Sequence, residues 1–151
     1  MDKPIEKLIH TDTPTKKMLQ ELVDRKQKYE QVQKQGLFWR MITIILSFLF
    51  LTYLYIWIYL PYKDQFDMIL KEFFDRSFHL VILLMIGGSY GATLFYKKKE
   101  DKKEKEFHEL RCEIIDKSTD LWNDDDAWRE REKVFEMMKR VYDINLYFES
   151  K

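Results

Sequence analysis

Two long apolar segments dominate the hydrophobic pattern of the chain. Residues 41–62 (MITIILSFLFLTYLYIWIYLPY) contain no acidic, basic or histidine side chain, and twenty helical residues rise about 30 Å, the hydrocarbon thickness of a bilayer. Residues 78–96 are a weaker second segment, with a histidine at the edge and three glycines. The pattern predicts transmembrane helices over 37–60 and 78–96. For the second segment, the alternative is a buried helix of a soluble domain.

Ahead of the first apolar segment, the spacing predicts a helix over residues 13–36. Thr13 is expected to cap this helix, with Pro14 in its first turn. Gly36 is the only break before the first span. The apolar stripe of this helix comprises Met18, Leu19, Leu22, Tyr29 and Val32. Residues 1–12 have few apolar groups and are expected to be loose.

Two more amphipathic helices are predicted after the second apolar segment, over residues 97–122 and 126–148. The acidic run Asn123-Asp124-Asp125-Asp126 separates their stripes. The first stripe includes Leu110, Ile114 and Leu121, and the second includes Trp128, Phe135, Met138 and Tyr142. The predicted fold is all-α: a membrane helical hairpin that continues into a cytosolic three-helix bundle or coiled coil. The last helix could instead dock on another protein.

The segment between the two spans, residues 61–77, is predicted to form a short external amphipathic loop. Its apolar residues recur at helical spacing: Phe66, Ile69, Leu70, Phe73 and Phe74. Such a helix lies on the outer leaflet or packs across the span ends. It serves either to detect lipid or simply to connect the spans while keeping its apolar face out of water.

Basic residues flanking the spans predict the orientation of the chain. Five basic residues precede Met41, the start of the first apolar segment, within sixteen residues, and residues 97–105 (KKKEDKKEK) hold six lysines against three acids. The connecting segment carries only Lys63, Lys71 and Arg76 against four acids. The positive-inside rule therefore places both termini in the cytoplasm of a multi-pass cell membrane protein. The residues expected at the inner leaflet, as a lipid contact or as a topology signal alone, are Lys97, Lys98, Lys99, Lys102 and Lys103.

Overall composition excludes a generic polyanion binder, since 26 basic residues balance 26 acidic ones. We therefore expect no nucleic-acid partner. The lone cysteine, Cys112, cannot form an internal disulfide and fits a reducing compartment.

Candidate chemistry is sparse. The acids Asp124 to Asp126 could bind a divalent metal, but three adjacent helical residues point about 100° apart and suit a helix start better. His108 and Cys112 share one helical face and could supply two zinc ligands, against the plain alternative of a solvated histidine beside a thiol. Nucleophile and phosphate-binding motifs are absent from the sequence, and the spans lack the buried Asp, Glu, Lys or Arg that mark ion or proton pathways. We expect no enzyme, cofactor, resident metal, small-molecule substrate or autonomous transport pathway.

Small residues on the second span predict close helix packing. Gly87 and Gly91 form G-x-x-x-G, and Gly88 with Ala92 forms a second small pair on the adjoining surface. Such pairs let two helix backbones approach closely. The partner is either the first span of the same chain or a neighbouring protein.

Three stretches of the sequence resemble the YpbF-like family of small two-span membrane proteins of Bacillus and relatives, a domain of unknown function. They are HTDTPTKKM, DRKQKYEQVQKQGLFW and KEFHELRCEIIDKSTDLW. The resemblance implies a bacterial cytoplasmic membrane and carries no activity or functional residues.

Two functional hypotheses follow. The first is a membrane-anchored interaction or scaffold protein that binds a protein partner or a second copy. Its cytosolic face would comprise Leu110, Ile114, Leu121, Phe135, Met138 and Tyr142. The second is an accessory subunit, or a lipid or envelope sensor, that acts through the transmembrane hairpin.

Overall fold

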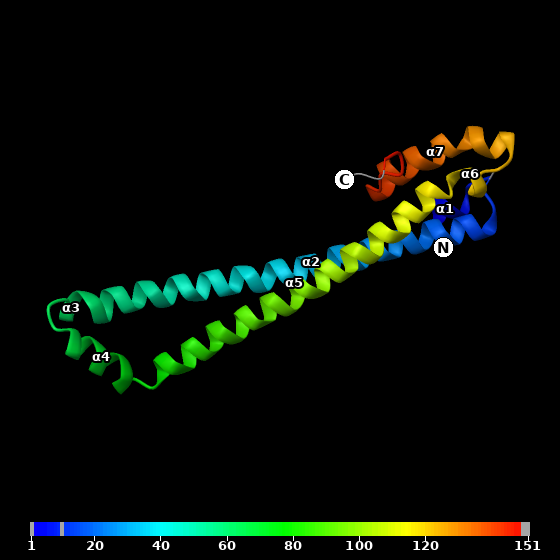
Figure 1. Cartoon of the computed structure of the whole chain (residues 1–151). Helices are drawn as coiled ribbons and strands as arrows, with labels where there is room; N and C mark the ends of the chain where they lie inside the picture. The colour runs from blue at the N-terminus through cyan, green and yellow to red at the C-terminus, as the bar shows by residue number, and fades with distance from the viewer. Residues whose placement is uncertain (1, 10, 149–151) are drawn as a thin grey trace. The chain divides into compact units, whose positions relative to one another are not determined.

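The computed structural model describes residues 2–9 and 11–148, and all regular structure in these ranges is helical. The elements are α1 Lys3–Glu6, α2 Thr13–Leu54, a π-helical turn Tyr55–Tyr59, α3 Leu60–Tyr62, α4 Phe66–Asp75, α5 Phe78–Asp116, α6 Ser118–Leu121 and α7 Asp125–Tyr142 (Figure 1). The predicted all-α class and the hairpin of two long apolar helices are confirmed. Two helical segments are long and apolar enough to cross a membrane. The first is Thr13–Tyr62, which runs from α2 to the end of α3, and the second is α5.

The chain divides into two compact units. Unit 1 consists of Met1–Gln31 with Asp101–Lys151, and unit 2 is Val32–Glu100. The helices α2 and α5 each contribute one part to unit 1 and one part to unit 2.

Helix α2 runs without interruption through the boundary predicted at residue 36. Gly36 is buried, and a Cβ atom added there would lie 3.5 Å from Cβ of Tyr96 on α5. The glycine therefore permits close approach of α5 rather than breaking α2. The helix start also differs from the prediction, because the Asp12 carboxylate, and not Thr13, accepts a hydrogen bond from the Thr15 N–H at 3.1 Å.

A π-helical turn precedes Pro61 at the end of the first apolar segment. Here the Leu60 N–H donates to the Tyr55 carbonyl, five residues back. Proline has no N–H, and its ring clashes with the carbonyl four residues earlier, so an ordinary helical turn cannot form there. The wider turn accommodates Pro61 and leads into α3, after which the chain reverses into α4.

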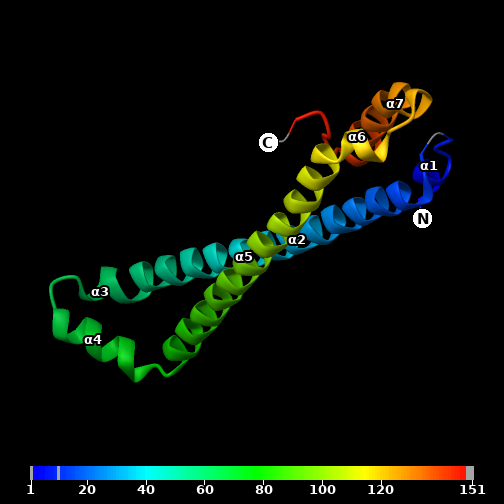
Figure 2. The same cartoon turned by 45° about the vertical axis from the view of Figure 1, so that its right-hand side comes forward.

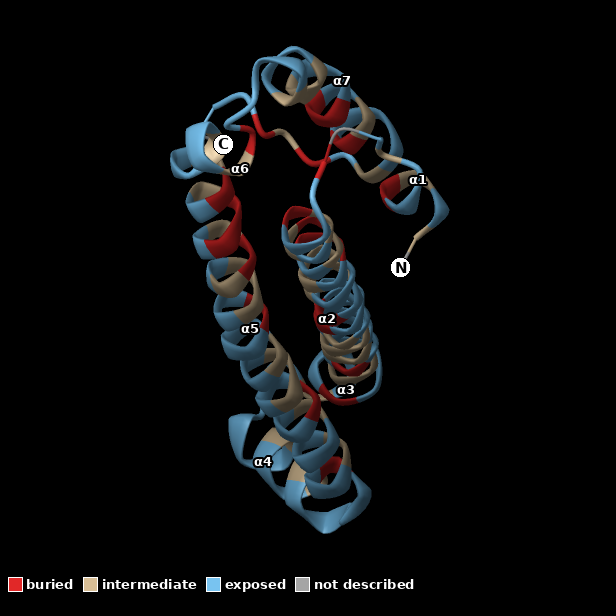
Figure 3. Ribbon diagram, turned by 90° about the vertical axis from the view of Figure 1, so that its right-hand side faces the viewer, coloured by how far each residue is buried: buried red, intermediate tan, exposed pale blue. Residues whose placement is uncertain are grey.

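The core of unit 1 joins α1, α2, α5 and α7. Its buried apolar residues are Ile5, Leu19, Leu22, Val23, Phe107, Leu110, Ile114, Trp122, Val134, Phe135, Met138, Ile144 and Leu146. In Figure 3 buried residues, in red, gather on α7 and on the adjoining end of α5. The last helix thus packs on its own chain, as the predicted three-helix bundle required.

Residues 3–6 form a helix that packs within unit 1, where a loose segment over 1–12 was predicted. Ile5 on α1 is completely buried in the unit 1 core. The Asp2 N–H donates to Oε1 of Gln20 at 2.7 Å, which ties this segment to α2. A single isoleucine in four helical residues gives no periodic signal, so the sequence could not reveal this packing.

Helix α7 ends at Tyr142, six residues earlier than predicted. Asp143 adopts the left-handed conformation with φ 55°, and the Ile144 N–H donates to the Met138 carbonyl at 3.1 Å. These are the marks of a Schellman-type helix end. The chain after it is not helical, yet Ile144 and Leu146 are completely buried in the core. The predicted helix over 97–122 is also divided, at Lys117, into α5 and α6.

Lys26 on α2 completes the end of α7, and this contact gives a testable prediction. Its ammonium group donates to the carbonyls of Tyr142 and Asp143 at 2.7 and 2.6 Å, and its side chain is only 13% exposed. Loss of a charged donor to these two carbonyls costs about 2 kcal/mol. We expect Lys26→Met to accelerate hydrogen exchange in the last turn of α7 about thirtyfold, at 1.4 kcal/mol per tenfold.

The matched control for this prediction is Lys28→Met. Lys28 is exposed on the same helix, so the exchange of α7 should stay within about twofold of the unchanged chain. Equal protection of α7 in both variants would show that Lys26 does not hold the helix end.

Unit 2 is a pair of antiparallel helices whose apolar residues point mostly outward. Only 11% of the residues in the apolar window of each helix are buried. Figures 1 and 2 both show α2 and α5 separating towards the end where α3 and α4 connect them.

Candidate functional site

The glycine face predicted for helix packing is not used between α2 and α5. Around the Cβ positions of Gly87, Gly88 and Gly91, no atom of the described residues lies within 4 Å beyond each glycine's immediate surroundings. All three glycines are exposed, and Ala92 is half-buried. Intramolecular packing through the G-x-x-x-G pair is therefore not observed, and this face of α5 is open.

Hydroxyl groups on the adjoining face hold the two helices together instead. The Thr43 hydroxyl donates to Oγ of Ser89 at 3.1 Å, and Oγ1 of Thr93 lies 3.5 Å from Oγ1 of Thr43. Ser89 is only 5% exposed. Sequence reasoning missed this contact, although Ser89 and Thr93 are spaced i, i+4 on one helical face.

This arrangement predicts opposite outcomes for two neighbouring positions on α5. Ser89→Leu removes a buried interhelical hydrogen bond and places four carbons between the helices. Together, the lost bond (about 0.6 kcal/mol in membrane proteins) and the overpacking (about 1–3 kcal/mol) should lower the melting temperature in detergent micelles by several degrees. Gly88→Leu points into open space and should leave the melting temperature unchanged. A larger loss in Gly88→Leu would show that the glycine face packs within the chain.

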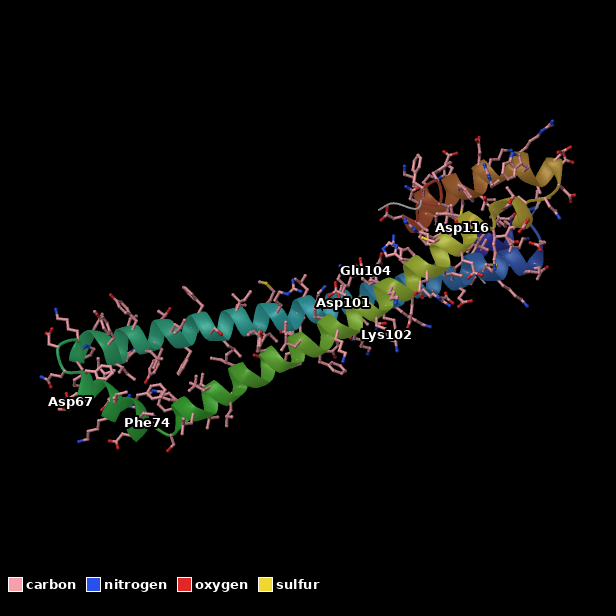
Figure 4. All side chains as sticks on the ribbon, viewed as in Figure 1. Asp67, Phe74, Asp101, Lys102, Glu104 and Asp116 are labelled. Carbon is pink, nitrogen blue, oxygen red and sulfur yellow. The ribbon has the colours of Figure 1, made fainter. Side chains whose placement is uncertain are left out.

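The lysine run follows the apolar part of α5, where Figure 4 labels Asp101, Lys102 and Glu104. Four of its predicted inner-leaflet residues, Lys97, Lys98, Lys99 and Lys102, are exposed, and Lys103 is half-buried. Lys103 donates to the Glu106 carboxylate at 2.7 Å, and this hydrogen bond lowers the pKa of Glu106. The run thus carries several exposed ammonium groups, and two of them pair with nearby acids, Lys97 with Glu100 and Lys105 with Glu109.

The face predicted for partner binding lies inside unit 1. Leu110, Ile114, Phe135 and Met138 are all buried in its core, while Leu121 and Tyr142 pack against it. An exposed interaction face made of these residues is therefore not observed. The stripes are buried because α7 folds back on α2 and α5, and an acidic substitution there tests folding rather than binding.

Tyr142 occupies an unusual position at the edge of this core. Burial raises the pKa of its phenol, and the nearby negative charge of Asp2 raises the pKa further. Its hydroxyl is buried without a hydrogen bond of good geometry to the described residues. Tyr142 therefore stays neutral at physiological pH and acts as an apolar packing residue.

An acidic groove crosses the surface of unit 1 at the start of α7. It has a volume of about 810 Å³. Its lining includes Asp12, Asp120, Asp124, Asp125 and Asp126, together with Ile9 and Arg129. Asp124 is the N-cap of α7 but makes no side-chain capping hydrogen bond, so these carboxylates act at the helix start through charge alone. Within residues 2–9 and 11–148, no group of three or more His, Cys, Asp or Glu side chains could hold a metal ion.

A second polar cluster lies in unit 2 beside α4. His79 is completely buried, and its Nδ1 lies 2.7 Å from the Phe73 carbonyl. Since a carbonyl only accepts, Nδ1–H donates there, and Nε2 is left to accept from the Tyr53 hydroxyl at 3.3 Å. Tyr53 in turn accepts from Arg76 at 3.3 Å, and Arg76 pairs with Glu72. Sequence reasoning registered His79 only as a polar residue at the edge of the span.

Comparisons with known proteins identify the family of the chain. A family model described as a protein of unknown function (DUF2663) matches residues 18–149. The chain belongs to the DUF2663 family. It is also similar to "Uncharacterized protein YpbF" of Bacillus subtilis (strain 168), with 50% identity over 141 residues, 93% of this chain and 92% of that protein. The predicted YpbF-like resemblance is confirmed.

No solved structure matches the chain. Any function of this DUF2663 member must therefore be argued from its own residues.

Proposed function

We propose that this chain is a non-enzymatic, membrane-anchored interaction protein. In this proposal, the unit 2 hairpin crosses the bacterial cytoplasmic membrane twice and both termini lie in the cytoplasm. Unit 1 is then a cytosolic helical domain that binds a protein partner or a second copy of the chain.

The observation that carries the proposal is the exposed apolar surface of unit 2. Leu51 and Leu84, near the centres of the two apolar segments, are 64% and 76% exposed. Further exposed residues include Ile44, Ile45, Phe48, Leu49, Leu80, Val81, Leu83 and Met85. A soluble monomer rarely exposes an apolar surface of this extent, whereas a bilayer covers it. Unit 1 has a buried apolar core of its own.

The membrane part of the proposal is tested with single-cysteine variants, because Cys112 is the only cysteine. In a Cys112→Ser background, Asp67→Cys places a thiol on α4 and Thr119→Cys places one on α6; both positions are exposed. A membrane-impermeant maleimide should label the α4 thiol in intact cells and the α6 thiol only after lysis. The reverse pattern would contradict the proposed orientation.

The interaction part is tested by site-specific photo-crosslinking in native membranes. The crosslinking residue replaces Trp128 or Val141, which are 40% and 47% exposed on α7. We expect both positions to capture the same protein, identified by mass spectrometry and confirmed by reciprocal capture. A second protein would make this chain an adaptor, and capture of the chain itself would make it a self-assembling scaffold. Absence of any protein adduct from α7 would refute the interaction role.

A second candidate function is an accessory subunit, or a lipid or envelope sensor, acting through the hairpin. The open surface at Gly87, Gly88 and Gly91 favours it, because small residues admit a helix of another protein. If this candidate is right, Gly87→Ile should abolish the function of the chain in the cell, whereas Trp128→Glu should leave that function intact. The favoured function expects the opposite result.

A further inference from the structure

An apolar crevice lies between α2 and α5 in unit 2. Its lining on α2 consists of Leu46, Leu49, Phe50 and Tyr53, and on α5 of Phe78, Ile82 and Met85. On each helix these residues recur three or four positions apart, so each set forms one continuous face. These residues lie in the last turns of α2 before α3 and the first turns of α5 after α4, the part in which the two helices separate (Figures 1 and 2).

The dimensions of the crevice suit a narrow, flexible occupant. Its volume is about 280 Å³, just below the roughly 300–1,000 Å³ of pockets for drug-sized ligands. Leu46 and Tyr53 are seven helical residues apart, so the crevice extends about 10 Å along α2. A second helix, about 10 Å across with its side chains, would occupy roughly 800 Å³ over this length, about three times the volume of the crevice. A single hydrocarbon chain fits.

One end of the crevice is closed by the polar cluster around His79. The rings of Phe50, Tyr53 and Phe78, which line the crevice, lie 6.1, 5.7 and 4.4 Å from the His79 ring. Hydrogen bonds run from Arg76 to Tyr53, from Tyr53 to His79 and from His79 to the Phe73 carbonyl of α4. This chain of bonds joins α2, α4 and α5 and fixes the rings at the closed end.

Arg76 pairs with Glu72 at the closed end, and its remaining N–H groups can donate to an anionic group. The Arg76 guanidinium has five N–H donors, and its contacts with Tyr53 and Glu72 occupy two nitrogens, Nη1 and Nη2. Its side chain is 44% exposed, so a phosphate can approach the outer edge of the planar group. An apolar crevice that ends at an arginine matches a lipid with its acyl chain inside and its phosphate at the rim.

We propose that this crevice binds one acyl chain of a membrane phospholipid, with the headgroup phosphate beside Arg76. The proposal rests on the membrane insertion proposed above. It adds a defined lipid site in the outer half of the hairpin, at which the lipid contacts α2, α5 and, through Arg76, the end of α4. Such a lipid occupies one defined site, whereas any exposed apolar helix makes only general contacts with lipid.

The test uses the full-length chain reconstituted in phospholipid vesicles that contain a phosphatidylglycerol with a photoactivatable diazirine in the middle of one acyl chain. Adducts are mapped by mass spectrometry. Ile82 lines the crevice and is half-buried, whereas Leu84 is 76% exposed and is not part of the lining. We expect adducts at Ile82 to exceed those at Leu84 at least fivefold. Equal labelling at these positions would overturn the proposal.

Two matched variants sharpen this test. Met85→Trp fills the crevice and should reduce crevice adducts at least fivefold, whereas Leu84→Trp should leave them within twofold. If Met85→Trp fails to fold, as judged by helix content and retention in the vesicles, Ile82→Phe takes its place. Unchanged crevice labelling in a folded filling variant would overturn the proposal, as would a crosslink from the crevice to a second copy.

The headgroup is tested with a diacylglycerol that carries the same diazirine chain and with Arg76→Gln. We expect the neutral lipid to label the crevice several-fold less than phosphatidylglycerol, and Arg76→Gln to remove this difference. Equal labelling by both lipids in the unchanged chain would overturn the phosphate contact. Extraction of the unchanged chain from membranes by alkaline carbonate would refute the proposed membrane insertion, whereas retention with uniform labelling would refute only the lipid site.

Discussion

Trp122→Ala is expected to unfold unit 1 while leaving the chain in the membrane fraction. Trp122 is 1% exposed and packs edge-on against Phe135, with the ring centroids 5.6 Å apart. Truncating a buried tryptophan costs about 3–5 kcal/mol, which is most of the stability of a small helical unit. The expected readouts are loss of hydrogen-exchange protection throughout α7 and rapid proteolysis after the apolar part of α5.

Two controls show whether this effect comes from burial. Trp128→Ala removes the same side chain from a position that is 40% exposed and stacked under Arg131, 3.7 Å from the ring centroid. Loss of that cation–π contact costs at most about 1 kcal/mol, so α7 should stay protected. Trp122→Phe should be milder than Trp122→Ala, because the indole N–H has no acceptor among the described residues. Equal damage from Trp122→Ala and Trp128→Ala would contradict the observed core.

The double variant Leu51→Asp, Leu84→Asp is expected to release the chain from the membrane. Both residues are more than 60% exposed and lie near the centres of the apolar segments. Each aspartate at the centre of a membrane helix costs about 3 kcal/mol of insertion free energy, together about 6 kcal/mol. The measurement is the fraction of chain that resists carbonate extraction, which should fall from nearly all to a minority.

If the hairpin lay in water, the same variant would not change the fraction of the chain that resists carbonate extraction. An exposed Leu→Asp change in water alters stability by less than about 0.5 kcal/mol and raises solubility. Ile9→Asp is the matched control, because Ile9 is 87% exposed on unit 1 and its change should not affect membrane retention. Full retention of the double variant in carbonate would exclude the proposed membrane crossing at these two residues.

The sequence could predict the helices because their signals are local. Apolar runs of this length, and stripes at a spacing of three or four residues, depend only on neighbouring residues. The starts and ends of helices were harder, since a cap competes with nearby alternatives. At α2, Asp12 rather than Thr13 accepts the capping hydrogen bond, and at α7 the left-handed Asp143 ends a stripe that continues apolar to Phe148.

The candidate sites could be predicted only in part. A hydrophobic stripe indicates that one face of a helix is covered. It does not indicate whether the same chain or another protein covers that face. The residues predicted to bind a partner, such as Phe135, are covered by α2 and α5. Gly87 and Gly91 show the reverse case, because the small residues predicted to pack are open while Ser89 beside them makes the contact.

By itself, the sequence determined that this chain is all-helical, that two of its helices have the length and composition of membrane spans, and that it resembles the family to which it belongs. These properties depend on the order and type of residues along the chain. Only the tertiary structure decided which faces meet: α7 on its own chain, Thr43 beside Ser89, and Lys26 at the end of α7. The two hydrogen bonds join residues 46 and 116 positions apart. These contacts depend on the geometry of the whole fold, because each helical face could pack against several other faces with similar residues.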